Sequence, residues 1–183
     1  MNRLFALSLF LVAACSGSDT LVPAPEVRAV ERVSARYASI EVLEVSLPEY
    51  ASEAEIYVEN DGALVSAGTL WADQPSRSVT LALSRNLTEI TGARIAPEPW
   101  PFDAYPEARV DVRIERLLAD EDNNLAMSGQ AFVADLTGHS RDRALVFSLT
   151  QPINDVPSPS NAAEARSAIV AQLAVLIARS GLR

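Results

Sequence analysis

The sequence predicts a single α/β domain of α+β character, in which a mixed, mostly antiparallel sheet is packed by two main helices. Residues 109–149 form three strand-like segments separated by short polar turns, a pattern typical of an antiparallel meander. Two further segments carry apolar residues at helical spacing, one near 75–91 and one after residue 160. Residues 1–36 lack such patterns, so we expect the domain to span 37–183, behind a signal peptide and a flexible tether.

The chain begins with a secretory signal pattern that ends at its only cysteine. Arg3 is followed by an 11-residue apolar stretch, 4–14, too short to span a bilayer. Leu11-Val12-Ala13-Ala14 resembles the lipobox of bacterial lipoproteins. This implies cleavage after a signal peptide of residues 1–14 and attachment of acyl chains such as palmitate to Cys15. The alternative is an ordinary signal peptide with an incidental buried cysteine.

Residues 15–36 are expected to form the acylated tether. They contain Pro23 and Pro25, charges of both signs and no firm apolar periodicity. Fully extended, a segment of this length would reach roughly 65 Å. A short helix over 26–35 is the alternative that the composition leaves open.

The domain opens with residues that alternate between apolar and polar. The alternation over 40–47 predicts a strand, with a change of phase at residues 42 and 43 that indicates a β-bulge. Pro48 ends it. Residues 56–58 form a second strand, and Asn60-Asp61-Gly62 predicts a hairpin turn into the next one.

A helix is predicted to begin at Asp73 and Pro75 and to end at Gly92, a suitable C-cap residue. The meander follows, with strands over 109–115, 125–136 and 143–149. A last helix begins at Ser160 or Asn161. The apolar stripes of the two helices are Val79, Leu83, Leu87 and Ile90 in the first and Ile169, Leu173, Leu176 and Ile177 in the second.

Residues 97–107 combine four prolines with aromatic residues, which excludes a helix or a central strand there. Exposed aromatic side chains held by prolines lose little entropy on binding. Trp100, Phe102 and Tyr105, together with Trp71, are therefore the candidate interface for a protein partner. The alternative is that both tryptophans fill core positions at helix ends.

The composition argues against several kinds of chemistry. The chain carries 24 acidic and 15 basic residues, and all the basic ones are Arg. An acidic surface argues against nucleic acid as a partner, and the absence of Lys excludes Schiff-base catalysis. The single histidine, His139, lies in a predicted turn, and zinc sites need several Cys or His ligands. We therefore expect no enzyme activity, no catalytic residue, no metal and no cofactor.

Several segments, taken in order, resemble the ABC-type transport auxiliary lipoproteins, the PqiC family, over about residues 37–180. Members often carry Trp on the strand that here includes Ala131 and Phe132, so the chain departs from the family there. The segments that carry the resemblance are Val45-Ser46-Leu47-Pro48-Glu49-Tyr50, Glu55-Ile56-Tyr57-Val58, Leu70-Trp71-Ala72-Asp73 with Pro75, Leu83 and Asn86-Leu87, the strand from Arg109 to Glu115, and Gln172-Leu173-Ala174 with Ile177-Ala178.

The resemblance implies a non-catalytic adaptor that is lipid-anchored in the outer membrane and faces the periplasm. Its partners would be an MCE-domain protein and inner-membrane transporter components of a system that moves lipids or hydrophobic compounds and maintains membrane integrity. Ser16 after the cysteine fits release to the outer membrane. A homo-oligomer is possible. The alternative function is a lipid- or small-molecule-binding lipoprotein, which predicts an apolar pocket between the sheet and the two helices; a hydrolytic enzyme is the third hypothesis.

Overall fold

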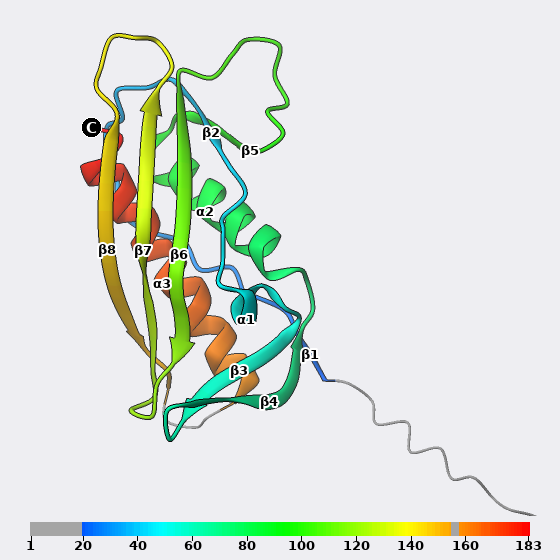
Figure 1. Cartoon of the computed structure of the whole chain (residues 1–183). Coiled ribbons are helices and arrows are strands. Elements are labelled where there is room, and N and C mark those ends of the chain that lie inside the picture. Colours follow the sequence, from blue (N-terminus) through cyan, green and yellow to red (C-terminus); the bar gives the residue numbers. More distant parts are fainter. Residues whose placement is uncertain (1–19, 155–157) are drawn as a thin grey trace, which may run out of the picture.

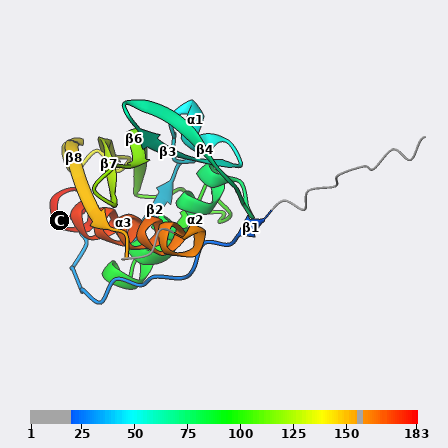
Figure 2. The same ribbon diagram turned by 90° about the horizontal axis from the view of Figure 1, so that it is seen from below.

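The structure, a computed structural model, describes residues 20–154 and 158–183 as an eight-stranded sheet with two long helices on one face (Figures 1 and 2). This confirms the predicted single mixed domain. The signal peptide 1–14 and Cys15 lie outside the described residues. The elements are β1 (Leu21–Val22), β2 (Ser39–Val42), α1 (Glu49–Ser52), β3 (Glu55–Asn60), β4 (Ala63–Trp71), α2 (Pro75–Thr91), β5 (Arg94–Pro97), β6 (Ala108–Ala119), β7 (Asn124–Asp135), β8 (Arg143–Pro152) and α3 (Pro159–Ser180).

β6 organises the sheet. One of its edges pairs with β7 in a long antiparallel ladder, and β7 pairs with β8 in the same way, as the meander predicts. Its other edge is shared by two strands that run parallel to it. β2 pairs with the start of β6, where Ile40 lies opposite Ala108, and β3 pairs with its end, where Val58 lies opposite Ala119. β5 extends the first branch, and β4 and β1 extend the second.

A β-bulge between Ile114 and Arg116 separates the two halves of β6. Gly129 lies opposite the bulge on β7, and a Cβ atom built on it would stand 2.2 Å from the carbonyl oxygen of Arg113. No side chain fits at that distance, so the close approach of the two strands requires glycine. The bulge bends the end of β6 toward the β3–β4 hairpin.

The predicted strand over 40–47 is correct only in its first part. β2 ends at Val42, and the chain then follows β6 irregularly: Leu43 N–H donates to the Val110 carbonyl at 2.9 Å. Val45 turns into the core, and its N–H donates to the Thr80 hydroxyl at 2.8 Å. The change of phase in the sequence therefore marks a departure from the ladder.

α2 ends at the predicted C-cap residue, but its N-cap is Gln74, one position after the predicted Asp73. Pro75 occupies its first turn after the N-cap residue Gln74, whose side chain accepts from Arg77 N–H. Gly92 ends the helix in the left-handed region with φ 71°, and its N–H donates to the Thr88 carbonyl at 2.8 Å. A residue with a side chain is strained in that conformation.

α3 begins slightly earlier than expected, at Pro159, with Ser158 as N-cap. It is long and apolar enough to cross a membrane, but 61% of that window is buried in the domain, as in a core helix. Leu176 of its predicted stripe is only partly buried. The core between the helices and the sheet is closed by fully buried side chains, among them Leu83, Leu87, Val110, Val112, Ile169, Leu173 and Ile177.

Residues 20–36, here called the N-terminal strap, lie packed along α2, where the sequence predicts a flexible tether. The side-chain oxygen of Asn86 accepts from Ala29 N–H at 2.8 Å, and its amide nitrogen donates to the Val27 carbonyl. Val33 N–H donates to the Ile90 carbonyl at the end of α2. Residues 20–36 are therefore packed on the domain, and the expected boundary at residue 37 does not appear among the described residues.

Candidate functional site

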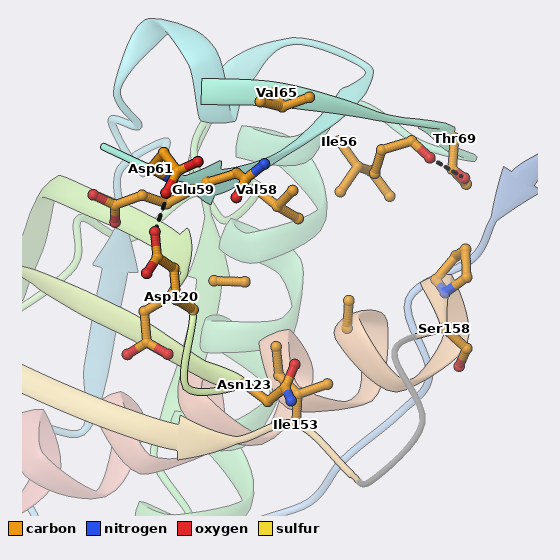
Figure 3. A pocket seen from close by; sticks show the side chains of 16 residues that line it. Ile56, Val58, Glu59, Asp61, Val65, Thr69, Asp120, Asn123, Ile153 and Ser158 are labelled. Atoms are coloured by element: carbon orange, nitrogen blue, oxygen red, sulfur yellow. Dashed lines mark hydrogen bonds between the residues drawn. The ribbon is translucent and has the colours of Figure 1, made fainter. Parts of the chain in front are cut away.

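A pocket of about 600 Å³ lies where the β3–β4 hairpin stands over the start of α3 (Figure 3). The hairpin is positioned by its Asn60-Asp61-Gly62 turn, in which Asp61 and Gly62 both adopt positive φ values. Ile56 and Val58 of β3 face the cavity from the hairpin side, and Ile153 faces it from the opposite side. The walls are thus mostly apolar.

Carboxylates form one rim of this pocket, and those of Glu59, Asp120 and Glu121 are engaged in local structure. Glu59 pairs with Arg116 at 2.5 Å, and Glu121 accepts from Asp61 N–H at 2.7 Å. Asp120 accepts from two N–H groups of the β6–β7 turn, including that of Asn124 at 2.8 Å. Across residues 20–154 and 158–183, no cluster of His, Cys, Asp or Glu could hold a metal ion. The rim gives the pocket mouth a negative charge.

Arg166 of α3 lies at the inner side of this region and is only 5% exposed. It lines a smaller hollow of about 50 Å³ that also contacts Trp71. The two hollows share the walls formed by Ile56, Val58, Ala119 and Ala162.

The guanidinium of Arg166 is held in place but not neutralised. Its carbon lies 3.6 Å from the centre of the Trp71 ring, and Nη2 donates to the Ser78 hydroxyl at 3.3 Å. Nη1 is buried and has no hydrogen-bond partner among the described residues. Burial lowers the pKa of Arg166 to about 10, although the negative charge of Asp73 acts in the opposite direction. The group still carries its charge at neutral pH.

The aromatic loop, residues 98–107, connects β5 to β6 at the end of the molecule opposite the hairpin (Figure 1). Trp100 is half-buried, and its indole N–H donates to the Ala104 carbonyl at 2.6 Å. Its ring meets Phe102 edge-on, with centroids 5.0 Å apart. Phe102 is 42% exposed and Tyr105 is 93% exposed.

The structure therefore separates the four candidate interface residues into two places. Trp100, Phe102 and Tyr105 share the aromatic loop, whereas Trp71 ends β4 and stacks on Arg166 beside the smaller hollow. His139 is exposed in the β7–β8 loop, and the hydroxyl of the adjacent Ser140 accepts from Arg36 at 3.4 Å. Cys15, the expected lipid attachment site, lies outside the described residues.

Sequence reasoning missed Arg166 and the pocket. A signal for Arg166 was present, because it precedes Ile169 by three positions and Leu173 by seven, which puts it on the apolar face of the helix. No comparable signal exists for the pocket, because its walls come from five separate segments of the chain.

Comparisons with known proteins agree with this architecture. A crystal structure of an uncharacterized protein superposes with a TM-score of 0.70 at 17% identity, covering 89% of this chain and 98% of its own. The structure of protein XCC0632 from Xanthomonas campestris, of the DUF330 family, superposes with a TM-score of 0.69 at 15% identity, covering 87% and 92%. At such identities these similarities establish the fold. A search of curated proteins found no match.

The decisive comparison is at the level of the family. Residues 20–178, which include the N-terminal strap and almost all of α3, match the family described as "ABC-type transport auxiliary lipoprotein component". The chain therefore belongs to the family of ABC-type transport auxiliary lipoprotein components.

Proposed function

We propose that the protein is a non-catalytic adaptor, anchored in the outer membrane through acyl chains on Cys15 and facing the periplasm. It would serve an ABC/MCE-type system that transports lipids or other hydrophobic compounds and so maintains membrane integrity. The observation that carries this proposal is family membership over nearly the whole described chain, behind a lipobox. Each CH₂ group that enters the bilayer contributes about 0.8 kcal/mol, so several acyl chains give a stable anchor.

The N-terminal strap gives this anchor a short reach. Thr20, the first described residue, follows Cys15 by five positions, a length of chain that spans at most about 18 Å. β1, at the start of the strap, pairs with β4, a strand of the hairpin that borders the pocket. On this proposal the pocket end lies close to the membrane, and the aromatic loop projects into the periplasm (Figure 1).

The aromatic loop is the proposed docking surface for the transport components. Its exposed rings, Phe102 and Tyr105, sit on a segment braced by Trp100, so little conformational freedom is lost on binding. Because β1 lies at the other end, the loop is directed away from the anchored end. An MCE-domain protein or another periplasmic component of the same system would meet it there.

The anchor is tested by Cys15→Ala and Ser16→Asp. Cys15→Ala should leave the fold intact but release the protein from the outer membrane and abolish complementation of a deletion strain. Ser16→Asp should keep the acyl chains but retain the protein in the inner membrane, so it separates anchoring from location. Membrane fractionation and complementation provide the readouts. A Cys15→Ala protein that still fractionates with the outer membrane and complements would refute the proposal.

The docking surface is tested by Tyr105→Ala. Val146→Ala is the control, because Val146 is also a large hydrophobic residue, is 84% exposed and lies on β8, outside the aromatic loop. Tyr105→Ala should weaken co-purification of the transport components at least tenfold without changing the melting temperature. Trp100→Ala distinguishes docking from support: lost stability indicates a bracing role, and lost partner binding at unchanged stability indicates direct contact. Unchanged co-purification for Tyr105→Ala and Phe102→Ala together would exclude this loop.

A second candidate function, binding of a lipid or another amphiphile, is favoured by the pocket. The pocket is not between the sheet and the two helices, where the sequence placed it, because that interface is filled by side chains such as Leu83 and Leu173. It lies beyond the bulge of β6, under the hairpin. A volume of this size is typical of small-molecule sites.

A further inference from the structure

We propose that the pocket binds a long-chain carboxylate, such as a fatty acid, with the carboxylate against Arg166 and the chain against Ile56 and Val58. The inference rests on the second candidate function and is independent of the adaptor role. It depends on three features of the described residues: an unpartnered buried cation, a small hollow beside it and a larger apolar pocket that shares its walls.

Arg166 lacks the anion that its burial calls for. Burying a charge without a partner is strongly unfavourable, and buried arginines are therefore usually paired. Asp73, whose negative charge acts on Arg166, is paired with Arg77 at 3.0 Å. The Nη1 atom of Arg166 is thus a buried donor whose partner is not supplied by residues 20–154 or 158–183. An anionic ligand would supply it.

The dimensions favour a carboxylate. The hollow beside Arg166 is about 50 Å³, and a cavity needs about 10–15 Å³ on the same measure to hold one water molecule, so the hollow accepts a group of a few atoms. A planar carboxylate matches the guanidinium fork and fits, whereas a phosphodiester carrying a second substituent is larger. The pocket of about 600 Å³ then accepts the chain along mostly apolar walls.

Charge sets the orientation of the ligand. The mouth carries Glu59, Asp120 and Glu121, which would repel an anionic group. Arg166 lies on the inner side, stacked on Trp71, where it attracts one. Glu55 also lines the smaller hollow, but its carboxylate already accepts hydrogen bonds from the hydroxyl groups of Tyr57 and Ser66. The carboxylate should therefore be innermost, with the chain extending toward the hairpin.

The test uses the full chain in isolated membranes. A photoreactive hexadecanoate with a diazirine near the chain end is added and activated, and the labelled peptides are mapped by mass spectrometry. The same chain with a terminal alcohol serves as the uncharged probe. We expect the carboxylate probe to label β3, β4 and the first turn of α3 at least ten times more strongly than the alcohol. Equal labelling by the two probes would overturn the assignment of Arg166 as the carboxylate partner.

Two variants make the result independent of folding. Arg166→Gln should reduce the labelling at least tenfold, whereas Arg85→Gln, which alters an exposed arginine on α2, should leave it unchanged. Ala162→Phe fills the wall shared by the two hollows and keeps Arg166, so it should also abolish labelling. Labelling that survives either Arg166→Gln or Ala162→Phe would contradict the site.

The readout also separates this inference from the adaptor role. Tyr105→Ala should lose transport components but keep full labelling, because the aromatic loop is remote from the pocket. Arg166→Gln should lose labelling but keep co-purification. Failure of one proposal therefore leaves the other standing.

Discussion

The two ends of the molecule differ in how closely their segments pack. At the aromatic-loop end, here called the joined end, neighbouring loops are hydrogen-bonded to one another. At the hairpin end, here called the open end, β3 and β4 are separated from α3 by a pocket of about 600 Å³. In the joined end, Leu136 N–H donates to the Glu107 carbonyl at 2.9 Å, which ties the β7–β8 loop to the aromatic loop. In the open end, a charged side chain links the β6–β7 turn to the hairpin, since Glu121 accepts from Asp61 N–H.

The difference begins within one strand. Before its bulge, β6 lies over the closed core, with Val110 and Val112 fully buried. After the bulge, the edge of β6 that faces away from β7 pairs with β3, where Val58 lies opposite Ala119. One long strand thus supports a closed half, suited to presenting a fixed surface, and a hollow half, suited to holding a ligand.

The largest effect should come from the closed half. Leu83→Ala should lower the free energy of unfolding by about 3–4 kcal/mol, because Leu83 is fully buried and its surroundings cannot collapse. Val58→Ala, on the pocket wall, should cost about 1 kcal/mol, because Val58 already borders empty space. Urea unfolding of the two variants measures the contrast. Equal losses would show that the two halves pack alike.

Gly129→Ala should cost about 3 kcal/mol, since the new Cβ would collide with the Arg113 carbonyl and force the bulge to shift. Because the bulge joins the two halves of β6, amide exchange should quicken on both sides of it. Ser128→Ala, on the adjacent position of β7, is the matched control and should change stability little. Loss of protection confined to one half would mean that the bulge does not couple the halves.

Asn86→Ala should cost about 2 kcal/mol, because the Ala29 N–H and the Val27 carbonyl lose their partner in a partly buried setting. Amide protection should fall along the N-terminal strap and remain unchanged in β7 and β8. Hydrogen exchange measured by mass spectrometry checks this, with Arg77→Ala on α2 as the control, since the exposed side chain of Arg77 pairs with Asp73 and not with the strap. Unchanged protection of the strap would show that other contacts hold it.

The smallest effect is a pH dependence confined to the joined end. Hydrogen bonds from Ser140 N–H and from the Thr137 hydroxyl lower the pKa of Asp135 below its usual value. This contribution is fully present above the unfolded pKa near 3.8 and is lost as the pH falls through the lower folded value. Protection of the β7–β8 loop should therefore fall in strong acid, and Asp135→Asn should remove that dependence. A loop whose protection factors stay constant with pH would contradict it.

The sequence predicts elements whose signals are local. The alternation in β6 and the spacing and caps of α2 identified both elements, because burial on one face leaves a period of two or 3.6. The strap escaped detection because its few buried apolar residues, such as Val22 and Val33, show no regular period, and its backbone bonds to Asn86, some 57 positions away. The irregular path after Val42 escaped for the same reason, since Val45 is held by Thr80 of α2.

The candidate sites also differ in whether their signal in the sequence is local. The aromatic loop was recognisable, because prolines and aromatic residues occur together in one short segment. The pocket was not, because it results from the separation of the hairpin from α3. Arg166 falls between the two cases: its position on an apolar helix face was visible in the sequence, but its missing partner was not.

The N-terminal strap also determines how force would enter the domain. If the N-terminal end of the chain is pulled, tension first reaches the bonds of β1, in which Leu70 N–H donates to the Thr20 carbonyl and Ala72 N–H donates to the Val22 carbonyl. The contacts at Asn86, Ile90 and finally Leu182 follow along the chain, so they would be loaded in turn. Such a series of contacts can break one at a time, so the strap would lengthen under tension while the sheet and the aromatic loop keep their shape.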